Sequence, residues 1–242
     1  MVSGAKHLST TGPRRYAFES TVETLATCIR LGEFGPGQRL PAERDLAARL
    51  GVSRSTLREA LDALRTAGLV ATTRGRCGGT AVVPAVAQRG PACGAAGGPN
   101  GSAPSTAISD LLIFRRVLEP GVASQAACVT LDDAQRDALL KALDDALHPG
   151  EDSARRAADT RLHLALAALT GSPMLLDAVT RVHRELHRHL AEIPALRVNL
   201  QHSATQHRYL VEAVLKGDAE RARLVMQEHC DATAALVRGL LA

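Results

Sequence analysis

The chain has 242 residues, which is enough for two modest domains with separate cores. Hydrophobic residues make up 45% of the sequence, which excludes a wholly disordered chain, whereas aromatic residues make up only 2%. The core must therefore be built from Ala, Leu and Val, and the abundance of Ala and Leu favours a helical protein over a β-sandwich. The net charge of +4 permits a nucleic-acid partner but does not require one.

The five cysteines are scattered and form no Cys-x-x-Cys pair, so neither a disulfide framework nor a thiolate zinc site is suggested. No stretch approaches 18 uncharged apolar residues, and the first residues contain no apolar signal region. We therefore expect a soluble cytoplasmic protein with no membrane partner.

The first third of the chain predicts three helices and a hairpin. Residues 1–15 are small and polar and are expected to form a flexible tail. Apolar spacing predicts helices over residues 19–31, 42–50 and 53–67. Between the last two, Gly51 suits a helix C-cap and Ser53 an N-cap. Two β-prone runs, residues 69–73 and 80–83, flank the turn RGRCGG and predict a β-hairpin.

The rest of the chain predicts a linker and a helical bundle. Residues 84–106 are rich in proline and glycine, which is typical of a linker. From residue 107 to 242 the pattern is helical almost throughout. Five breaks divide it into about six helices, at Thr130, Pro149–Gly150, Gly171–Pro173, Pro194 and Gly217–Asp218. We therefore predict a mainly α protein in which an N-terminal domain, residues 16–83, precedes an all-α bundle.

The second and third predicted helices form a helix-turn-helix pattern. In this motif the second helix lies in the major groove of DNA, and its N-terminal residues meet the base edges. Arg54 or Arg58 suits paired hydrogen bonds to guanine, worth about 1–3 kcal/mol of discrimination. The other candidates are Ser53, Ser55, Thr56 and Arg44 for phosphate oxygens, and Arg74 and Arg76 at the hairpin tip for the minor groove. Taken singly, each arginine could equally be an ordinary solvated charge.

Residues 31–70 also carry a specific frame: a Gly-Pro-Gly turn, LP-x-ER-x-LA, GVSR-x-x-x-REAL and a final GLV. This frame resembles the winged helix-turn-helix of the GntR family of bacterial transcription regulators, over about residues 19–83. The hairpin would be the wing. The resemblance implies operator contacts by Arg44, Arg54, Thr56, Arg58 and the wing glycine Gly75. Cys77 interrupts the usual glycine-rich run of the wing.

The C-terminal half contains most of the histidines. Asp159 and His163 are four residues apart on one predicted helix, so they share a face, and His207 and His229 lie on two later helices. Three imidazoles and a carboxylate suit Zn²⁺, Ni²⁺ or Mn²⁺ better than Mg²⁺ or Ca²⁺. By spacing alone, a purely structural role for each histidine is the stronger interpretation.

This half resembles the FCD ligand-binding domain of the FadR subfamily of GntR regulators, over about residues 108–240. The matching motifs are DLLIFRRVLEP, D-x-x-x-H followed by LA-x-x-TG, and H-x-x-L-x-x-A-x-x-x-GD. The resemblance implies Asp159, His163, His207 and His229 as ligands of a divalent metal, with zinc expected first. Leu162 and Ser172 replace commoner residues of the family without removing a ligand.

The resemblance also implies a small carboxylate effector held partly by the metal. Arg115 is the candidate partner of that carboxylate, and an ion pair with Glu119 one turn later is its alternative role. For the cluster His183, His187 and His189, a solvated or interface role is favoured over a place in the site.

Together these patterns predict a metabolite-responsive repressor that binds a pseudo-palindromic DNA operator as a homodimer. We expect no catalytic residues, because no HExxH or similar acid-bearing motif accompanies the metal pattern. The alternatives are a regulator that responds to the metal alone, an architectural DNA binder, and a metal-dependent hydrolase.

Overall fold

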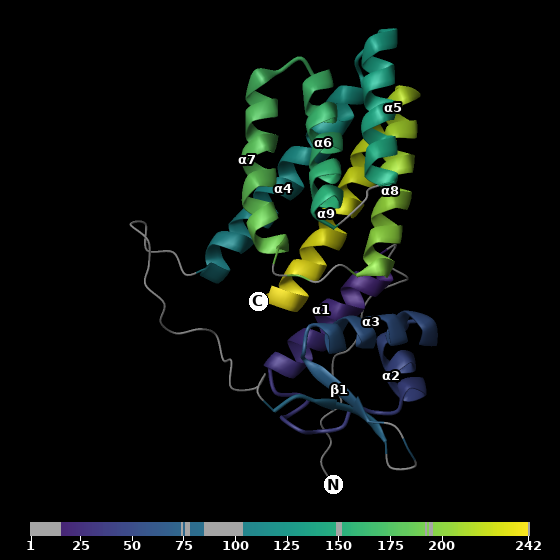
Figure 1. Cartoon of the computed structure of the whole chain (residues 1–242), viewed down its shortest axis with the longest axis vertical. Coiled ribbons are helices and arrows are strands. Elements are labelled where there is room, and N and C mark those ends of the chain that lie inside the picture. Colours follow the sequence, from purple (N-terminus) through teal and green to yellow (C-terminus); the bar gives the residue numbers. More distant parts are fainter. Residues whose placement is uncertain are drawn as a thin grey trace. The chain divides into compact units, whose positions relative to one another are not determined.

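The computed structural model describes residues 16–73, 75, 78–84, 104–148, 152–191, 193 and 196–241, the side chains of residues 104–106 and 152–153 excepted. The chain divides into two compact units, one formed by residues 1–96 with 235–242 and the other by residues 97–234 (Figure 1). The described residues are mainly helical, as predicted. The predicted tail and most of the predicted linker lie outside the described residues.

The N-terminal unit contains three helices: α1 (Ala17–Arg30), α2 (Glu43–Leu50) and α3 (Arg54–Thr66). Both α1 and α2 pack against α3, and Leu25, Leu46, Leu57 and Leu64 are fully buried between them. The turn between α2 and α3 is the predicted one, because Gly51 caps α2 with a left-handed φ of 66° and Ser53 caps α3. This short turn makes the pair a helix-turn-helix.

The predicted hairpin follows α3. Strands β1 (Val70–Thr73) and β2 (Gly79–Val82) pair antiparallel, with Val70 opposite Val82 and Thr73 opposite Gly79. Val70 and Val82 are buried, whereas Ala71, Thr72 and Thr73 are exposed, so the hairpin is anchored at its base. At its tip, Gly75 has a φ of 116°, which a residue with a side chain rarely adopts.

The C-terminal unit contains the six predicted helices in chain order, and α9 continues into the residues that group with the N-terminal unit. They are α4 (Pro104–Ala127), α5 (Asp133–Leu147), α6 (Asp152–Leu169), α7 (Pro173–Leu190), α8 (Arg197–Leu215) and α9 (Ala219–Leu241). Local chemistry sets several starts: Asp132 and Gln135 form a capping box before α5, and Ser172 caps α7 with Pro173 in its first turn.

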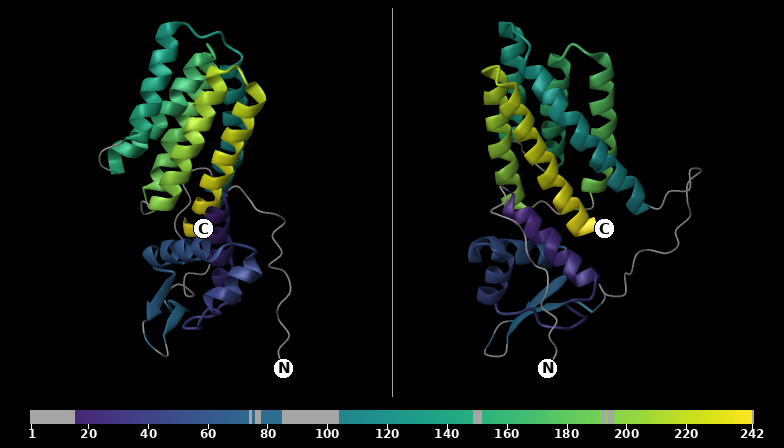
Figure 2. Two further views of the ribbon diagram at one scale, coloured as in Figure 1. Left: turned by 90° about the vertical axis from the view of Figure 1, so that its right-hand side faces the viewer. Right: turned by 180° about the vertical axis from the view of Figure 1, so that it is seen from behind.

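These helices form a bundle in which α6 lies between α5 and α7 (Figure 1). The long helix α4, seen from behind in the right-hand view of Figure 2, contacts α6, α7 and α8. Its core is aliphatic and includes Leu139, Leu162, Leu166, Leu210 and Met226. Among the described residues, no helix is both long and apolar enough to cross a membrane.

The interior of the bundle also holds polar side chains. Among the described residues of this unit, the buried polar or charged side chains are Arg115, Glu119, His163, His183, His207 and His229. Since burying polar groups is costly unless they are paired or bind a ligand, this cluster marks the candidate site.

Candidate functional site

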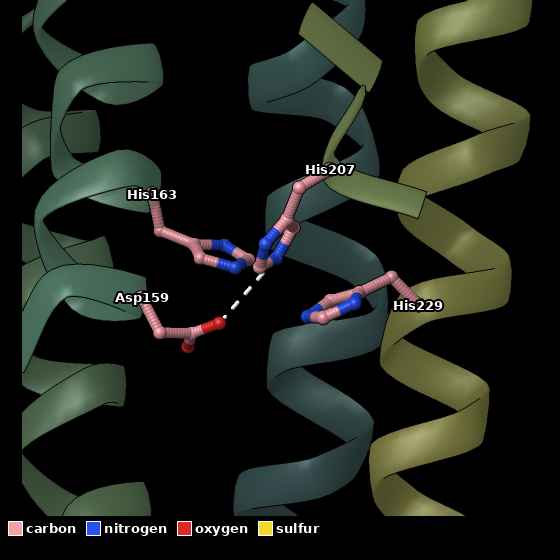
Figure 3. A group of neighbouring side chains, drawn as sticks. All are labelled: Asp159, His163, His207 and His229. Atoms are coloured by element: carbon pink, nitrogen blue, oxygen red, sulfur yellow. Dashed lines mark ion pairs between the residues drawn. The ribbon is translucent and has the colours of Figure 1, made fainter. Parts of the chain in front are cut away.

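The four predicted metal ligands come together inside the C-terminal unit (Figure 3). Asp159 and His163 project from successive turns of α6, His207 from α8 and His229 from α9. Each side chain offers one ligand atom, and these four atoms lie within 4.8 Å of one another. The arrangement therefore joins three helices around one point.

The imidazoles of this group are packed against one another. The ring centroids of His207 and His229 are 4.8 Å apart, and those of His163 and His229 are 5.2 Å apart. Nε2 of His207 lies 3.4 Å from Oδ1 of Asp159. Asp159 is the one partly open member, since 34% of its side chain is exposed while that of His207 is 3% exposed. Asp159 therefore lies nearest to solvent of the four side chains.

The geometry fits a divalent ion. Nε2 of His163 and Nε2 of His207 are buried and have no hydrogen-bond partner, and such atoms are stabilised if they coordinate a cation. Zinc binds imidazole nitrogen at about 2.0–2.1 Å, so the ligand atoms of a tetrahedral site lie roughly 3.4 Å apart. Nε2 of His207 and Oδ1 of Asp159 already lie 3.4 Å apart, and all four ligand atoms lie within 4.8 Å of one another.

Charge states in the site also suit a cation. Burial lowers the pKa of His207 to about 4, against the attraction of Asp159. Burial, with repulsion from His207, places the pKa of His229 well below its ordinary value. Burial opposes ionisation of Asp159, but the attraction of the neighbouring histidines is stronger and lowers the pKa of its carboxyl. Neutral imidazoles and an ionised carboxylate are the forms that bind a metal ion.

Gln206 is a supporting residue that the sequence reasoning missed. Its Oε1 lies 3.2 Å from Nδ1 of His229, on the helix turn that also carries His207. An oxygen acceptor at Nδ1 leaves Nε2 of that imidazole for a metal ion. No sequence signal points to Gln206, because the contact depends on how α8 packs against α9.

Arg115 lies beside the metal group and is 1% exposed. Its Nε donates a hydrogen bond of 2.8 Å to Oε1 of Glu119, so the alternative role predicted for Arg115 is present. Its Nη1, however, is buried without a hydrogen-bond partner. The ion pair with Glu119 therefore leaves one guanidinium nitrogen for a further acceptor.

The favoured prediction for His183 is wrong. His183 is 2% exposed, and its Nε2 lies 3.1 Å from Oε1 of Glu119, so it belongs to the interior cluster and not to a solvated face. His187 is half-buried, with Nε2 3.1 Å from the hydroxyl of Thr160. The amphipathic spacing on α7 could not reveal which of its faces meets Glu119.

The predicted DNA-binding residues gather at the start of α3. The hydroxyl of Ser53 accepts a hydrogen bond of 3.0 Å from the amide of Thr56 and lies 2.8 Å from the hydroxyls of Ser55 and Thr56. Arg54 is exposed in the first turn of this helix. The helix terminus therefore presents hydroxyl groups and a cation to solvent, as a phosphate-binding surface requires.

The other predicted DNA-binding residues differ in whether their side chains already pair with a neighbouring carboxylate. Nε of Arg58 donates to Glu43 at 2.7 Å, and Nε of Arg44 donates to its neighbour Asp45 at 3.1 Å, although the side chain of Arg44 is 83% exposed. Gly75 lies at the hairpin tip. Arg74 lies outside the described residues, as do Arg76 and Cys77.

Both domains match known families. Residues 18–82 match the "Bacterial regulatory proteins, gntR family" domain, and residues 110–232 match the FCD domain. Among curated proteins, RmpR of Mycobacterium gastri, named as an HTH-type transcriptional regulator, is 35% identical over 87% of this chain and 76% of its own. The HTH-type transcriptional repressor NanR of Citrobacter rodentium is 31% identical over 92% of this chain and 85% of its own.

A solved structure of Streptococcus agalactiae GntR aligns with 90% of this chain and 98% of its own, at 26% identity and a TM-score of 0.47. The two domain matches and the curated relatives agree with the helix-turn-helix, hairpin and helical bundle described above. The chain therefore belongs to the GntR family, with an FCD domain following its DNA-binding domain, and is a transcription regulator rather than an enzyme.

Proposed function

We propose that this regulator is a cytoplasmic homodimer that represses transcription from a pseudo-palindromic operator and responds to a small carboxylate metabolite. Its C-terminal unit would bind one divalent ion, zinc first, through Asp159, His163, His207 and His229. The observation that carries the proposal is the convergence of these four ligand atoms within 4.8 Å in a largely buried interior.

The proposed effector site lies at the junction of the ion and Arg115. A bound ion supplies a Lewis-acidic centre to which a carboxylate oxygen can coordinate. The chain supplies the unpartnered Nη1 of Arg115 as a charge-assisted hydrogen-bond donor. A small anion would approach the ion from the side of Asp159, which is the one partly exposed ligand.

The proposed operator contacts follow from the start of α3. Arg54 would read a base edge from the major groove, and Ser53, Ser55 and Thr56 would bind phosphate oxygens. A single reading helix covers one half-site, so two copies related by a two-fold axis would meet the two halves of a palindrome.

Metal analysis tests the first half of the proposal. The full chain is loaded with zinc, freed of excess ion, and analysed by elemental mass spectrometry beside the double variant His163→Ala/His207→Ala. The double variant His148→Ala/His189→Ala is the matched control, because it removes two histidines outside the four-ligand group. We expect about one ion per chain in the parent and the control, and almost none in the ligand variant. If the parent chain binds no zinc, the proposed metal centre is wrong.

DNA binding tests the second half. Affinity for an operator selected from random DNA is measured by fluorescence anisotropy, with and without zinc, and then with a panel of small carboxylates. We expect a carboxylate to weaken operator binding only when the metal is present. Affinity that follows zinc alone indicates a metal-responsive regulator, and affinity that follows neither indicates an architectural DNA binder.

A further inference from the structure

One buried carboxylate outside the four-ligand group touches side chains from three helices. Glu119 of α4 is 1% exposed. Its Oε1 accepts from Nε of Arg115 at 2.8 Å and lies 3.1 Å from Nε2 of His183 on α7. Its Oε2 lies 2.5 Å from Nδ1 of His163 on α6. Glu119 thus joins a proposed metal ligand to the proposed effector-binding arginine.

Glu119, His163 and His183 could be taken for a second metal site, since their ligand atoms also lie within 4.8 Å of one another. Two features oppose this interpretation. His163 belongs to both groups, and one imidazole holds two ions only after losing both ring protons. The guanidinium of Arg115 already pairs with Glu119, so a second cation there meets a fixed positive charge at short range.

We infer that Glu119 is a positioning residue of the proposed metal centre, with two functions. It accepts the Nδ1 proton of His163, which leaves Nε2 of that ring deprotonated for the ion. It also accepts a hydrogen bond from Nε of Arg115, and this contact fixes the guanidinium so that its unpartnered Nη1 can donate to an anion. The inference rests on the proposed metal site and adds the residue that prepares it.

The physical reason lies in the tautomers of histidine. A neutral imidazole carries its proton on one nitrogen, and the acceptor beside one nitrogen decides which one is free to bind a metal. Nδ1 of His163 and Oε2 of Glu119 lie 2.5 Å apart, and neither atom has a hydrogen-bond partner elsewhere among the described residues, so this carboxylate oxygen is the acceptor available to Nδ1. Nε2 of His163 likewise has no partner.

Only an ionised carboxylate serves both neighbours. Both of its oxygens are acceptors: Oε1 accepts from Nε of Arg115, and Oε2 faces Nδ1 of His163.

The variant Glu119→Gln separates this role from simple space filling. Glutamine has nearly the same shape but replaces one acceptor oxygen by an NH₂ donor. If the NH₂ faces His163, Nδ1 must accept and Nε2 keeps its proton; if the amide is turned, the NH₂ faces the Nε–H of Arg115. We expect zinc affinity, measured on the full chain by competition with a chelating dye, to fall about 10–100-fold.

The matched control is Asp231→Asn. It also removes one negative charge close to the cluster, but Asp231 pairs with the exposed Arg116 and does not touch a proposed ligand. We expect its zinc affinity to change less than about twofold, because the ion pair of Asp231 is with Arg116, half of whose side chain is exposed, and not with a proposed ligand. Equal losses in both variants would assign the effect to net charge and overturn the positioning role.

A second measurement needs no substitution and decides the question if Glu119→Gln does not fold. In the parent chain labelled with ¹⁵N-histidine, the ring correlations of His163 report its tautomer. We expect the Nδ1–H form, with and without zinc. The Nε2–H form in the metal-free parent, or unchanged zinc affinity in Glu119→Gln, overturns the inference while leaving the metal site intact. A parent that binds no zinc overturns the proposed metal centre and this role together.

Discussion

Acidification of the metal-free chain is expected to destabilise its C-terminal unit. The reason is His207, whose pKa falls from 6.5 to about 4 on burial in the fold. Between these two values the unfolded chain binds a proton at His207 and the folded chain does not. Stability therefore rises with pH across this window and is lost as the pH falls from about 6.5 to 4.

The magnitude follows from the two pKa values. A tenfold difference in proton affinity corresponds to about 1.4 kcal/mol. Relative to pH 7, His207 by itself lowers the free energy of unfolding by about 2 kcal/mol at pH 5 and about 3 kcal/mol at pH 4. His183 and His229 act in the same direction, since burial lowers both of their pKa values.

The assay is urea denaturation of the EDTA-treated chain at pH 7, 6 and 5, followed by circular dichroism. His207→Gln serves as the control, because it removes the proton-binding group and is expected to flatten the pH dependence by about 2 kcal/mol at pH 5. A free energy of unfolding that is equal at pH 7 and pH 5 in the parent would refute the reasoning.

Three further predictions concern single side chains. Arg54→Ala is expected to weaken operator binding by about 1–3 kcal/mol in fluorescence anisotropy, whereas Arg65→Ala, at the far end of α3, should have little effect; similar losses would contradict the proposed docking. Ser53→Ala removes the hydroxyl that caps α3 and should lower the stability of the N-terminal unit by about 1 kcal/mol in thermal unfolding, and an unchanged transition would argue against the cap. Leu166→Ala should cost about 2–5 kcal/mol in urea denaturation, because Leu166 is fully buried in the bundle core; Leu140→Ala, at a partly exposed position on α5, should cost far less, and equal costs would contradict this packing.

Much of the fold could be predicted because its signals are local. Gly51 and Ser53 end one helix and begin the next through their own backbone and hydroxyl chemistry. Likewise, Gly171 and Gly217 have left-handed φ values where the sequence predicted breaks between helices. These features depend on neighbours within a few residues, so a linear pattern reveals them.

The metal ligands could be named only in part from local spacing. Asp159 and His163 are one helical turn apart, so they share a face in any α-helix. His207 and His229 lie on other helices, and only the resemblance to the FCD domain joined them to the first pair. The structure brings the four together because α6, α8 and α9 pack into one bundle.

The sequence by itself determined the helices, their ends, the hairpin and the family, since each depends on short-range periodicity or on a contiguous motif. Only the tertiary structure decided the surroundings of the site. It buried His183, placed Gln206 beside His229, and brought Glu119, whose ion pair with Arg115 the sequence had offered as an alternative, into contact with His163. These contacts connect residues up to 64 positions apart. Their existence depends on the rotation of each helix about its axis, which the packing of the whole aliphatic core sets.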